Sequence, residues 1–119
     1  MEAQEAFTRE TLLAWMTRMG RKGLSFVELL RAFPDARGDY ALEIRENLVL
    51  WVNLSRDAVR VITEALRDKA VEVRPTHLLV YVIDGTTLDL PIAKKARGYK
   101  KLHWLPAVLN VGPATRDER

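Results

Sequence analysis

The residues of this chain whose types could bind phosphate are concentrated in one segment. Residues 93–104 read AKKARGYKKLHW and contain five cations with no acid among them: Lys94, Lys95, Arg97, Lys100 and Lys101. The whole chain has 19 Lys and Arg against 16 Asp and Glu, so without these five the remaining 14 basic residues face 16 acidic ones. The basic character therefore lies in this segment, and a local cluster can contact phosphates even when the net charge is only +3.

Aromatic residues are interleaved with these cations, at Tyr99, His103 and Trp104. Basic side chains follow a nucleic-acid backbone and aromatic rings stack on bases, so the combination favours a nucleic-acid-binding surface. The alternative is a solvated basic loop in which Trp104 folds back onto the core with Leu105, Val108 and Leu109. We favour phosphate binding, because five unopposed cations repel one another unless an anion compensates them.

A second pattern could hold a metal ion on a phosphodiester. Asp35 follows Pro34, and Glu43 and Arg45 follow eight and ten residues later. Two carboxylates and a cation near a strand can bind Mg²⁺, but Arg45 keeps its proton where a lysine could give one up. The chain has no cysteine and no glycine-rich phosphate loop, GxSxG or HExxH motif. We therefore expect no enzyme, with no catalytic residues, metal or cofactor.

Two N-terminal helices are expected ahead of these groups. Thr8 is the predicted N-cap of the first helix and Gly20 its end. Residues 25–28 read SFVE, a capping box that opens the second helix, and Pro34 stops that helix. The apolar residues of the first helix recur at helical spacing and predict one buried face: Leu12, Trp15, Met16 and Met19.

Ser55 caps a third predicted helix with two distinct faces. Its apolar face is formed by Ala58, Val61, Ile62, Ala65 and Leu66. The opposite face is an arginine stripe, formed by Arg56, Arg60, Thr63 and Arg67. Arginine can bind guanine edges or phosphates in a DNA groove, but the acids Asp57, Glu64 and Asp68 flank the stripe, so a salt-bridged solvent face is an equal alternative.

Four segments are predicted to be extended. Residues 48–52 are a continuous apolar run with β-branched and aromatic members, which favours a short buried strand carrying Trp51 into the core. Residues 71–74 begin a second extended segment. Residues 78–83 and 86–90 then flank Asp84-Gly85, a dipeptide typical of a type I′ turn, and so predict a β-hairpin.

Three capped helices followed by a hairpin resemble a winged helix-turn-helix domain over roughly residues 8 to 91. The resemblance is one of element order. It implies that the third helix is the recognition helix and that the Asp84-Gly85 hairpin is the wing, which assigns Arg56, Arg60, Thr63 and Arg67 to groove or phosphate contacts. Winged helices also serve as protein-docking modules, and a wing tip without a basic residue suits that alternative.

The overall expectation is an α+β fold, a three-helix winged-helix-like domain with a hairpin wing and a basic C-terminal extension. It occupies residues 1–110, with 111–119 as a flexible tail. We expect a DNA-binding protein that acts in transcription regulation. We expect it to be cytoplasmic, because no apolar run could span a membrane and the start MEAQE lacks the residue order of a signal peptide. Double-stranded DNA is the expected partner, with a transcription or replication protein as the alternative, no membrane, and a homodimer left open.

Overall fold

The first two helices begin where the sequence predicts. The computed structural model describes residues 6–95 and 97–113, and in it α1 (Arg9–Arg18) is capped by Thr8 and α2 (Phe26–Ala32) by Ser25. Ser25 Oγ accepts a hydrogen bond from the Glu28 N–H while the Glu28 carboxylate accepts one from the Ser25 N–H, which completes the capping box. Gly20 follows α1 with a φ of +103°, the left-handed conformation that commonly ends a helix.

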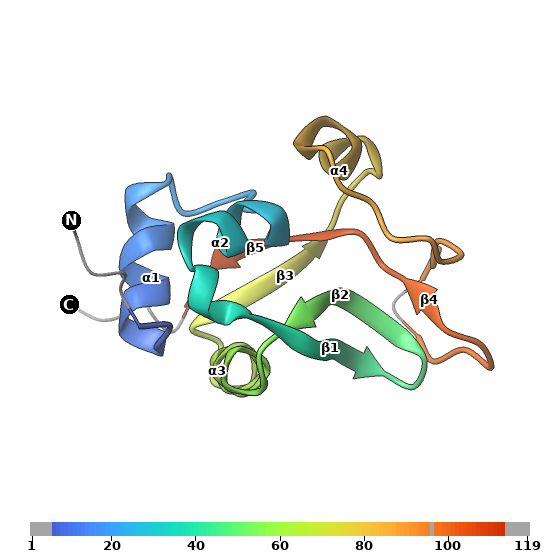
Figure 1. Ribbon diagram of the computed structural model, residues 1–119, viewed down its shortest axis with the longest axis horizontal. Helices are drawn as coiled ribbons and strands as arrows, with labels where there is room; N and C mark the ends of the chain where they lie inside the picture. The colour runs from blue at the N-terminus through green and yellow to red at the C-terminus, as the bar shows by residue number, and fades with distance from the viewer. Residues whose placement is uncertain (1–5, 96, 114–119) are drawn as a thin grey trace.

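A long hairpin separates α2 from the third helix. After the 3₁₀ turn η1 (Pro34–Ala36), β1 (Arg37–Arg45) and β2 (Leu48–Leu54) pair antiparallel, so the expected strand at 48–52 is confirmed. The two strands are joined at Glu46-Asn47, where Asn47 has a φ of +57° that asparagine tolerates better than most residues. Figure 1 shows this hairpin extending away from α1 and α2 toward the end of the molecule where β4 lies.

The third helix, α3 (Arg56–Arg67), begins directly after β2 and is capped by Ser55 as predicted. It packs against β1, β3 and α1. A Cβ atom on Gly38 would lie 2.6 Å from Ser55 Cα, so only glycine lets β1 pass this close to the start of α3. The buried residues of α3 belong to its predicted apolar face: Ala58, Val61, Ile62 and Ala65.

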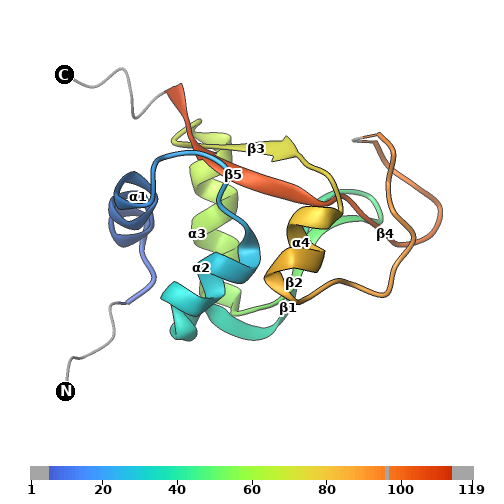
Figure 2. The same ribbon diagram turned by 90° about the horizontal axis from the view of Figure 1, so that it is seen from above.

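The strand that follows α3 pairs with the last strand of the fold. β3 (Val71–Pro75) is antiparallel to β5 (Ala107–Val111) although residues 76–106 separate them (Figure 2). Leu24, which lies between α1 and α2, adds a bridge to Leu109 through backbone hydrogen bonds of 3.1 and 2.8 Å. β4 (His103–Trp104) pairs parallel with β2, which gives a second sheet of order β1-β2-β4.

The predicted hairpin at residues 78–90 is wrong. α4 (Leu79–Asp84) is a short helix that ends at Gly85, where φ is +90°, and residues 86–90 belong to no strand. A glycine with positive φ ends a helix as readily as it makes a turn, so Asp84-Gly85 does not distinguish the two. The helix is fixed by Tyr81, whose buried hydroxyl accepts from the Phe26 N–H (3.1 Å) and donates to the Ala107 carbonyl (2.6 Å).

Tyr81 belongs to an aromatic cluster at the centre of the core. Its ring stacks on Trp51 at 4.9 Å between centroids and meets Trp104 edge-on at 5.2 Å. Trp104 is fully buried and donates from Nε1 to the Leu50 carbonyl, so assigning it to a base-stacking surface was wrong and the alternative, that it covers the core, is confirmed. Trp51 is buried as predicted.

Within the described residues the architecture is a compact α+β domain of four helices and small sheets of mixed strand direction, which confirms the predicted class. None of the helices described is long and apolar enough to cross a membrane. β5 continues through the buried residue Val111, so the predicted tail at 111–119 includes the last residue of a strand. The remainder of that tail, from residue 114, lies outside the described residues.

Candidate nucleic-acid interface

The basic loop, residues 94–103 without residue 96, is fastened to the turn of the β1–β2 hairpin. The Asn47 side-chain amide donates to the carbonyl oxygens of Tyr99 (3.0 Å) and Lys100 (3.1 Å). The backbone adds two hydrogen bonds, from Tyr99 N–H to the Glu46 carbonyl (3.0 Å) and from His103 N–H to the Asn47 carbonyl (2.8 Å). The loop is therefore held by four hydrogen bonds to two turn residues, which fixes the backbone from which its cations project.

Two rings and a guanidinium stack at the centre of the basic loop. The rings of Tyr99 and His103 lie 4.0 Å apart and are inclined by 18°, and Arg97 Cζ lies 4.9 Å from the Tyr99 centroid. The His103 ring and the Arg97 guanidinium therefore both pack on the Tyr99 ring. Partial desolvation raises the pKa of Tyr99, but hydrogen bonding to the Lys95 backbone and the Arg97 guanidinium outweigh it, and the net pKa lies below the ordinary 10.0.

The cations of the basic loop have no acidic partners in the part of the chain that the structure describes. All five side chains are exposed, and none forms a salt bridge there. Glu46 borders an open hollow together with Arg97, Gly98, Tyr99 and Lys100, but its carboxylate makes no ion pair with them. These cations are therefore exposed on one loop, and among the described residues their charge is left uncompensated.

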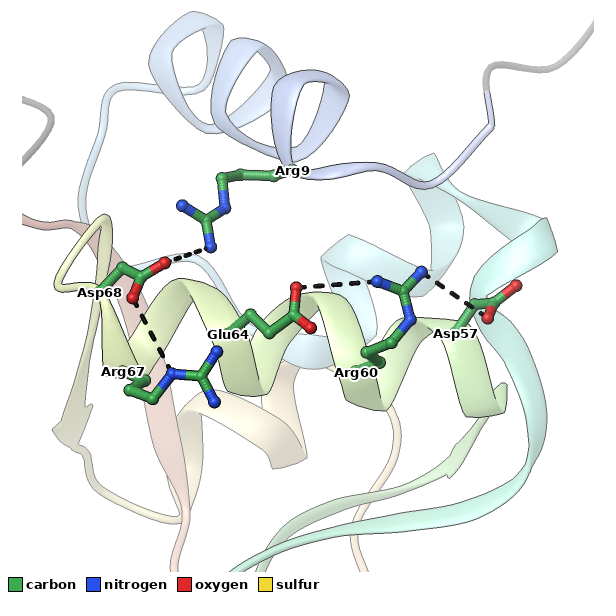
Figure 3. A network of polar contacts seen from close by, with 6 residues as sticks. All are labelled: Arg9, Asp57, Arg60, Glu64, Arg67 and Asp68. Atoms are coloured by element: carbon green, nitrogen blue, oxygen red, sulfur yellow. Dashed lines mark hydrogen bonds and ion pairs between the residues drawn. The ribbon is translucent and has the colours of Figure 1, made fainter.

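The arginine stripe on α3 is arranged differently (Figure 3). Arg60 lies between Asp57 (3.8 Å) and Glu64 (3.7 Å), while Arg67 lies 3.9 Å from Asp68. Asp68 also receives a 2.7 Å hydrogen bond from Arg9 of α1, and this bond is the main reason that its pKa is lowered. The acids flanking the stripe thus neutralise two of its three arginines, as the salt-bridge alternative predicts.

The remaining members of the stripe are Arg56 and Thr63. Arg56 reaches over the ring of Tyr40 on β1, with Cζ 5.6 Å from the centroid and a 3.1 Å hydrogen bond to the phenol oxygen. Thr63 is exposed and borders a groove between α3 and β1. Arg56 follows the end of β2, whereas the basic loop is fastened to the turn before β2, and the 7 residues of β2 span roughly 20 Å. The other end of the stripe, at Thr63 and Arg67, borders residues 42–45 of β1. Among the described residues no hydrogen bond or ion pair joins the stripe to the basic loop.

Comparison of the chain with family models, curated proteins and solved structures finds no match.

The nuclease-like residues are spread over two elements. Asp35 lies in η1, whereas Glu43 and Arg45 lie on β1, and the Glu43 carboxylate accepts a hydrogen bond from the Asn47 N–H. No group of three or more His, Asp or Glu that could hold a metal ion occurs among residues 6–95 and 97–113. Glu43 thus serves the hairpin turn.

Asn47 is the functional residue that sequence reasoning missed. A signal for it was present, since Glu46-Asn47 separates an alternating segment from an apolar run, and asparagine is common in two-residue hairpin turns. That its side chain would reach a segment more than 50 positions away could not be inferred locally, because the contact depends on how β4 pairs with β2.

Proposed function

We propose that this protein binds double-stranded DNA through phosphate contacts made by the basic loop, and that it acts in transcription regulation. The observation that carries the proposal is the contrast in charge compensation between the two basic regions. Lys94, Lys95, Arg97, Lys100 and Lys101 are free to contact phosphates, whereas Arg60 and Arg67 of α3 already have carboxylate partners. Uncompensated cations on a fixed backbone release condensed counterions when they bind DNA, which favours association.

The proposal includes a winged-helix-like arrangement. β3 follows α3 directly and pairs antiparallel with β5, so a strand pair is present but it is formed by other segments than those first expected. Residues 76–106, which include the basic loop, connect these two strands and so occupy the position of a wing. In this arrangement the wing carries the phosphate contacts, which supports a DNA-binding role better than the short Asp84-Gly85 tip did.

The state of the aromatic residues favours duplex over single-stranded DNA. Single-strand binders need exposed rings on which bases stack. Trp104 is fully buried, and the Tyr99 ring already has His103 and Arg97 packed on it. The basic loop therefore offers charge without a free stacking platform, and contacts with the backbone of a duplex need only the charge.

Fluorescence anisotropy with a labelled random duplex tests this proposal. We expect Lys100→Ala with Lys101→Ala to weaken binding and to reduce the slope of log K against log salt by about 1.8, because each lost phosphate contact removes about 0.9. Lys94→Ala with Lys95→Ala should act similarly. The matched control, Arg60→Ala with Arg67→Ala, also removes two cations but should leave the slope unchanged. If only the control pair reduced the slope of log K against log salt, the phosphate contacts would belong to α3 and the assignment to the basic loop would be refuted.

A protein-docking function is the second candidate, favoured by the apolar surface of α4. Leu79, Val82 and Ile83 are 56%, 50% and 81% exposed, at a spacing that groups them on one side of the helix. An acidic partner from the transcription or replication machinery would complement the basic loop. This function predicts no duplex binding at about 50 mM salt, and recovery of a partner that is lost with Ile83→Ser.

A further inference from the structure

A cavity beside α2 lies outside the proposed DNA-binding surface. It lies between α2, the start of β1, the end of β2 and the segment after α4, and it has a volume of about 170 Å³. Its lining consists of Val27, Leu30, Arg31, Arg37, Trp51, Asn53 and Thr86. From this lining we propose that the cavity binds a small organic acid, with the carboxylate between Arg31 and Arg37 and an apolar body against Trp51.

The floor of the cavity is apolar and rigid. Val27, Leu30 and Trp51 are each more than nine-tenths buried, with exposed fractions of 8%, 4% and 3%. Trp51 is further fixed by stacking on Tyr81 and Phe26. A preformed apolar floor with a few polar groups at one side is the usual composition of a small-molecule site.

The polar side of the cavity is cationic. Neither Arg31 nor Arg37 forms a salt bridge with any residue that the structure describes, and no acid is among the lining residues. The Asp84 carboxylate, which comes from the neighbouring α4, instead accepts a 2.6 Å hydrogen bond from Ser25 Oγ. A ligand carboxylate in this cavity would accept charge-assisted hydrogen bonds from these guanidinium groups.

The guanidinium of Arg31 is held in place beside the cavity. Its Nη2 donates to the Asp84 carbonyl at 2.9 Å, which holds the guanidinium by one of its five N–H groups and leaves the others for a ligand. Asn53 has a φ of +60° beside Arg37's pairing partner Leu54, and with Thr86 it adds hydrogen-bonding groups to the wall. Arginine favours planar carboxylates because its fork matches their two oxygens.

The size of the cavity restricts the ligand. Pockets for drug-sized molecules and cofactors measure roughly 300 to 1,000 Å³, so a nucleotide would not fit in 170 Å³. A monocarboxylate with one ring or a short branched chain is the class that suits both the volume and the floor. For such a ligand we expect a Kd of about 1 mM.

A titration followed by ¹⁵N–¹H NMR of the full chain tests the proposal, with benzoate as the probe and uncharged benzamide as its control. Benzoate should cause saturable shifts of the Trp51, Asn53 and Thr86 amides, and benzamide should cause none in the same range. Arg31→Gln with Arg37→Gln should weaken benzoate binding about tenfold or more, since charge-assisted hydrogen bonds are lost. Arg45→Gln with Arg74→Gln, which removes two exposed arginines outside the cavity, should leave the affinity unchanged.

Equal binding of benzamide would overturn the proposal, because the cations would then contribute nothing. Unchanged benzoate affinity in a folded Arg31→Gln, Arg37→Gln variant would overturn it as well, as would the absence of saturation at about 20 mM benzoate, well above the expected Kd. The basic-loop variants Lys100→Ala and Lys101→Ala should retain benzoate binding whether or not the protein binds DNA, so the two proposals fail separately.

Discussion

The side-chain amide of Asn47 donates a 3.0 Å hydrogen bond to the carbonyl oxygen of Tyr99, and so joins the hairpin turn to the basic loop. A second bond from the same amide reaches the Lys100 carbonyl. In the proposed function Asn47 does not contact DNA, but it fixes the backbone from which the neighbouring cations project.

Replacing Asn47 with glycine should release the basic loop. Glycine keeps the positive φ of this position but removes both side-chain hydrogen bonds, and we expect a loss of about 1 kcal/mol in the free energy of unfolding. Hydrogen exchange of the Tyr99 and His103 amides should accelerate. Asn53→Gly is the matched control, because Asn53 also has positive φ but is exposed and makes no contact with the basic loop. Equal exchange rates in both variants would contradict the anchoring role.

Removing the Tyr81 hydroxyl should destabilise the fold. Tyr81→Phe keeps the ring packing on Trp51 but leaves the buried Phe26 N–H and Ala107 carbonyl without their partner, at a cost of about 2 kcal/mol in urea unfolding. Tyr40→Phe removes an exposed hydroxyl that binds Arg56 and should cost at most about 0.5 kcal/mol. Similar losses in the two variants would show that Tyr81 does not link α4 to the core.

Tyr81 also gives the protein an alkaline stability limit. Burial raises the pKa of its phenol well above the ordinary 10.0, so the unfolded state releases this proton at a lower pH than the folded state does. Stability from this group is complete below pH 10 and falls as the pH rises above it. The difference in unfolding free energy between wild type and Tyr81→Phe should therefore narrow as the pH rises from about 10 to about 12. A constant difference would contradict the buried, protonated state.

Substitution by alanine should destabilise the fold at Gly112 but not at Gly98. A Cβ atom on Gly112 would collide with the Lys69 carbonyl oxygen, a backbone atom that cannot move without disturbing the link between α3 and β3. We expect Gly112→Ala to cost about 2 kcal/mol or more in thermal unfolding. On Gly98 the nearest atom to such a Cβ would be the Glu46 carbonyl at 3.5 Å, an ordinary contact, so Gly98→Ala should be nearly neutral. A neutral Gly112→Ala would contradict the close approach.

The elements that could be predicted are those with local chemical signals. The Ser25–Glu28 capping box and the Ser55 cap mark helix starts through contacts three residues apart, and both helices begin there. The apolar spacing of α3 likewise identified its buried face. The ion pairs of Arg60 also follow from local spacing, since both partners lie within one helical turn.

The segment from residue 78 to 90 could not be predicted because distant contacts decide it. Its β-branched residues favour a strand by propensity, but the buried position of Tyr81 between Phe26 and Ala107 requires a helix there. The pairing of β3 with β5 is equally non-local, since the sequence of neither strand indicates its pairing partner on the other side of residues 76–106.

The sequence predicted which cations belong to the candidate site, but it did not predict the contacts that hold them. The basic loop was identified by its charge, and its cations are exposed as expected. Three features of the loop depend on the parallel pairing of β4 with β2, which no short-range pattern indicates. They are the attachment through Asn47, the packing of His103 and Arg97 on Tyr99, and the burial of Trp104.

The position of β5 in the chain has a consequence for biosynthesis. β5 supplies the strand partner of β3 and the bridge partner of Leu24, and through Ala107 it also binds Tyr81. In a nascent chain emerging from the ribosome, β3, Leu24 and Tyr81 therefore lack these partners until residues 107–111 have left the exit tunnel. Contacts of such long sequence separation form slowly. Folding of this domain is thus expected to complete only after β5 has emerged, and chaperones meet an unfinished core before that point.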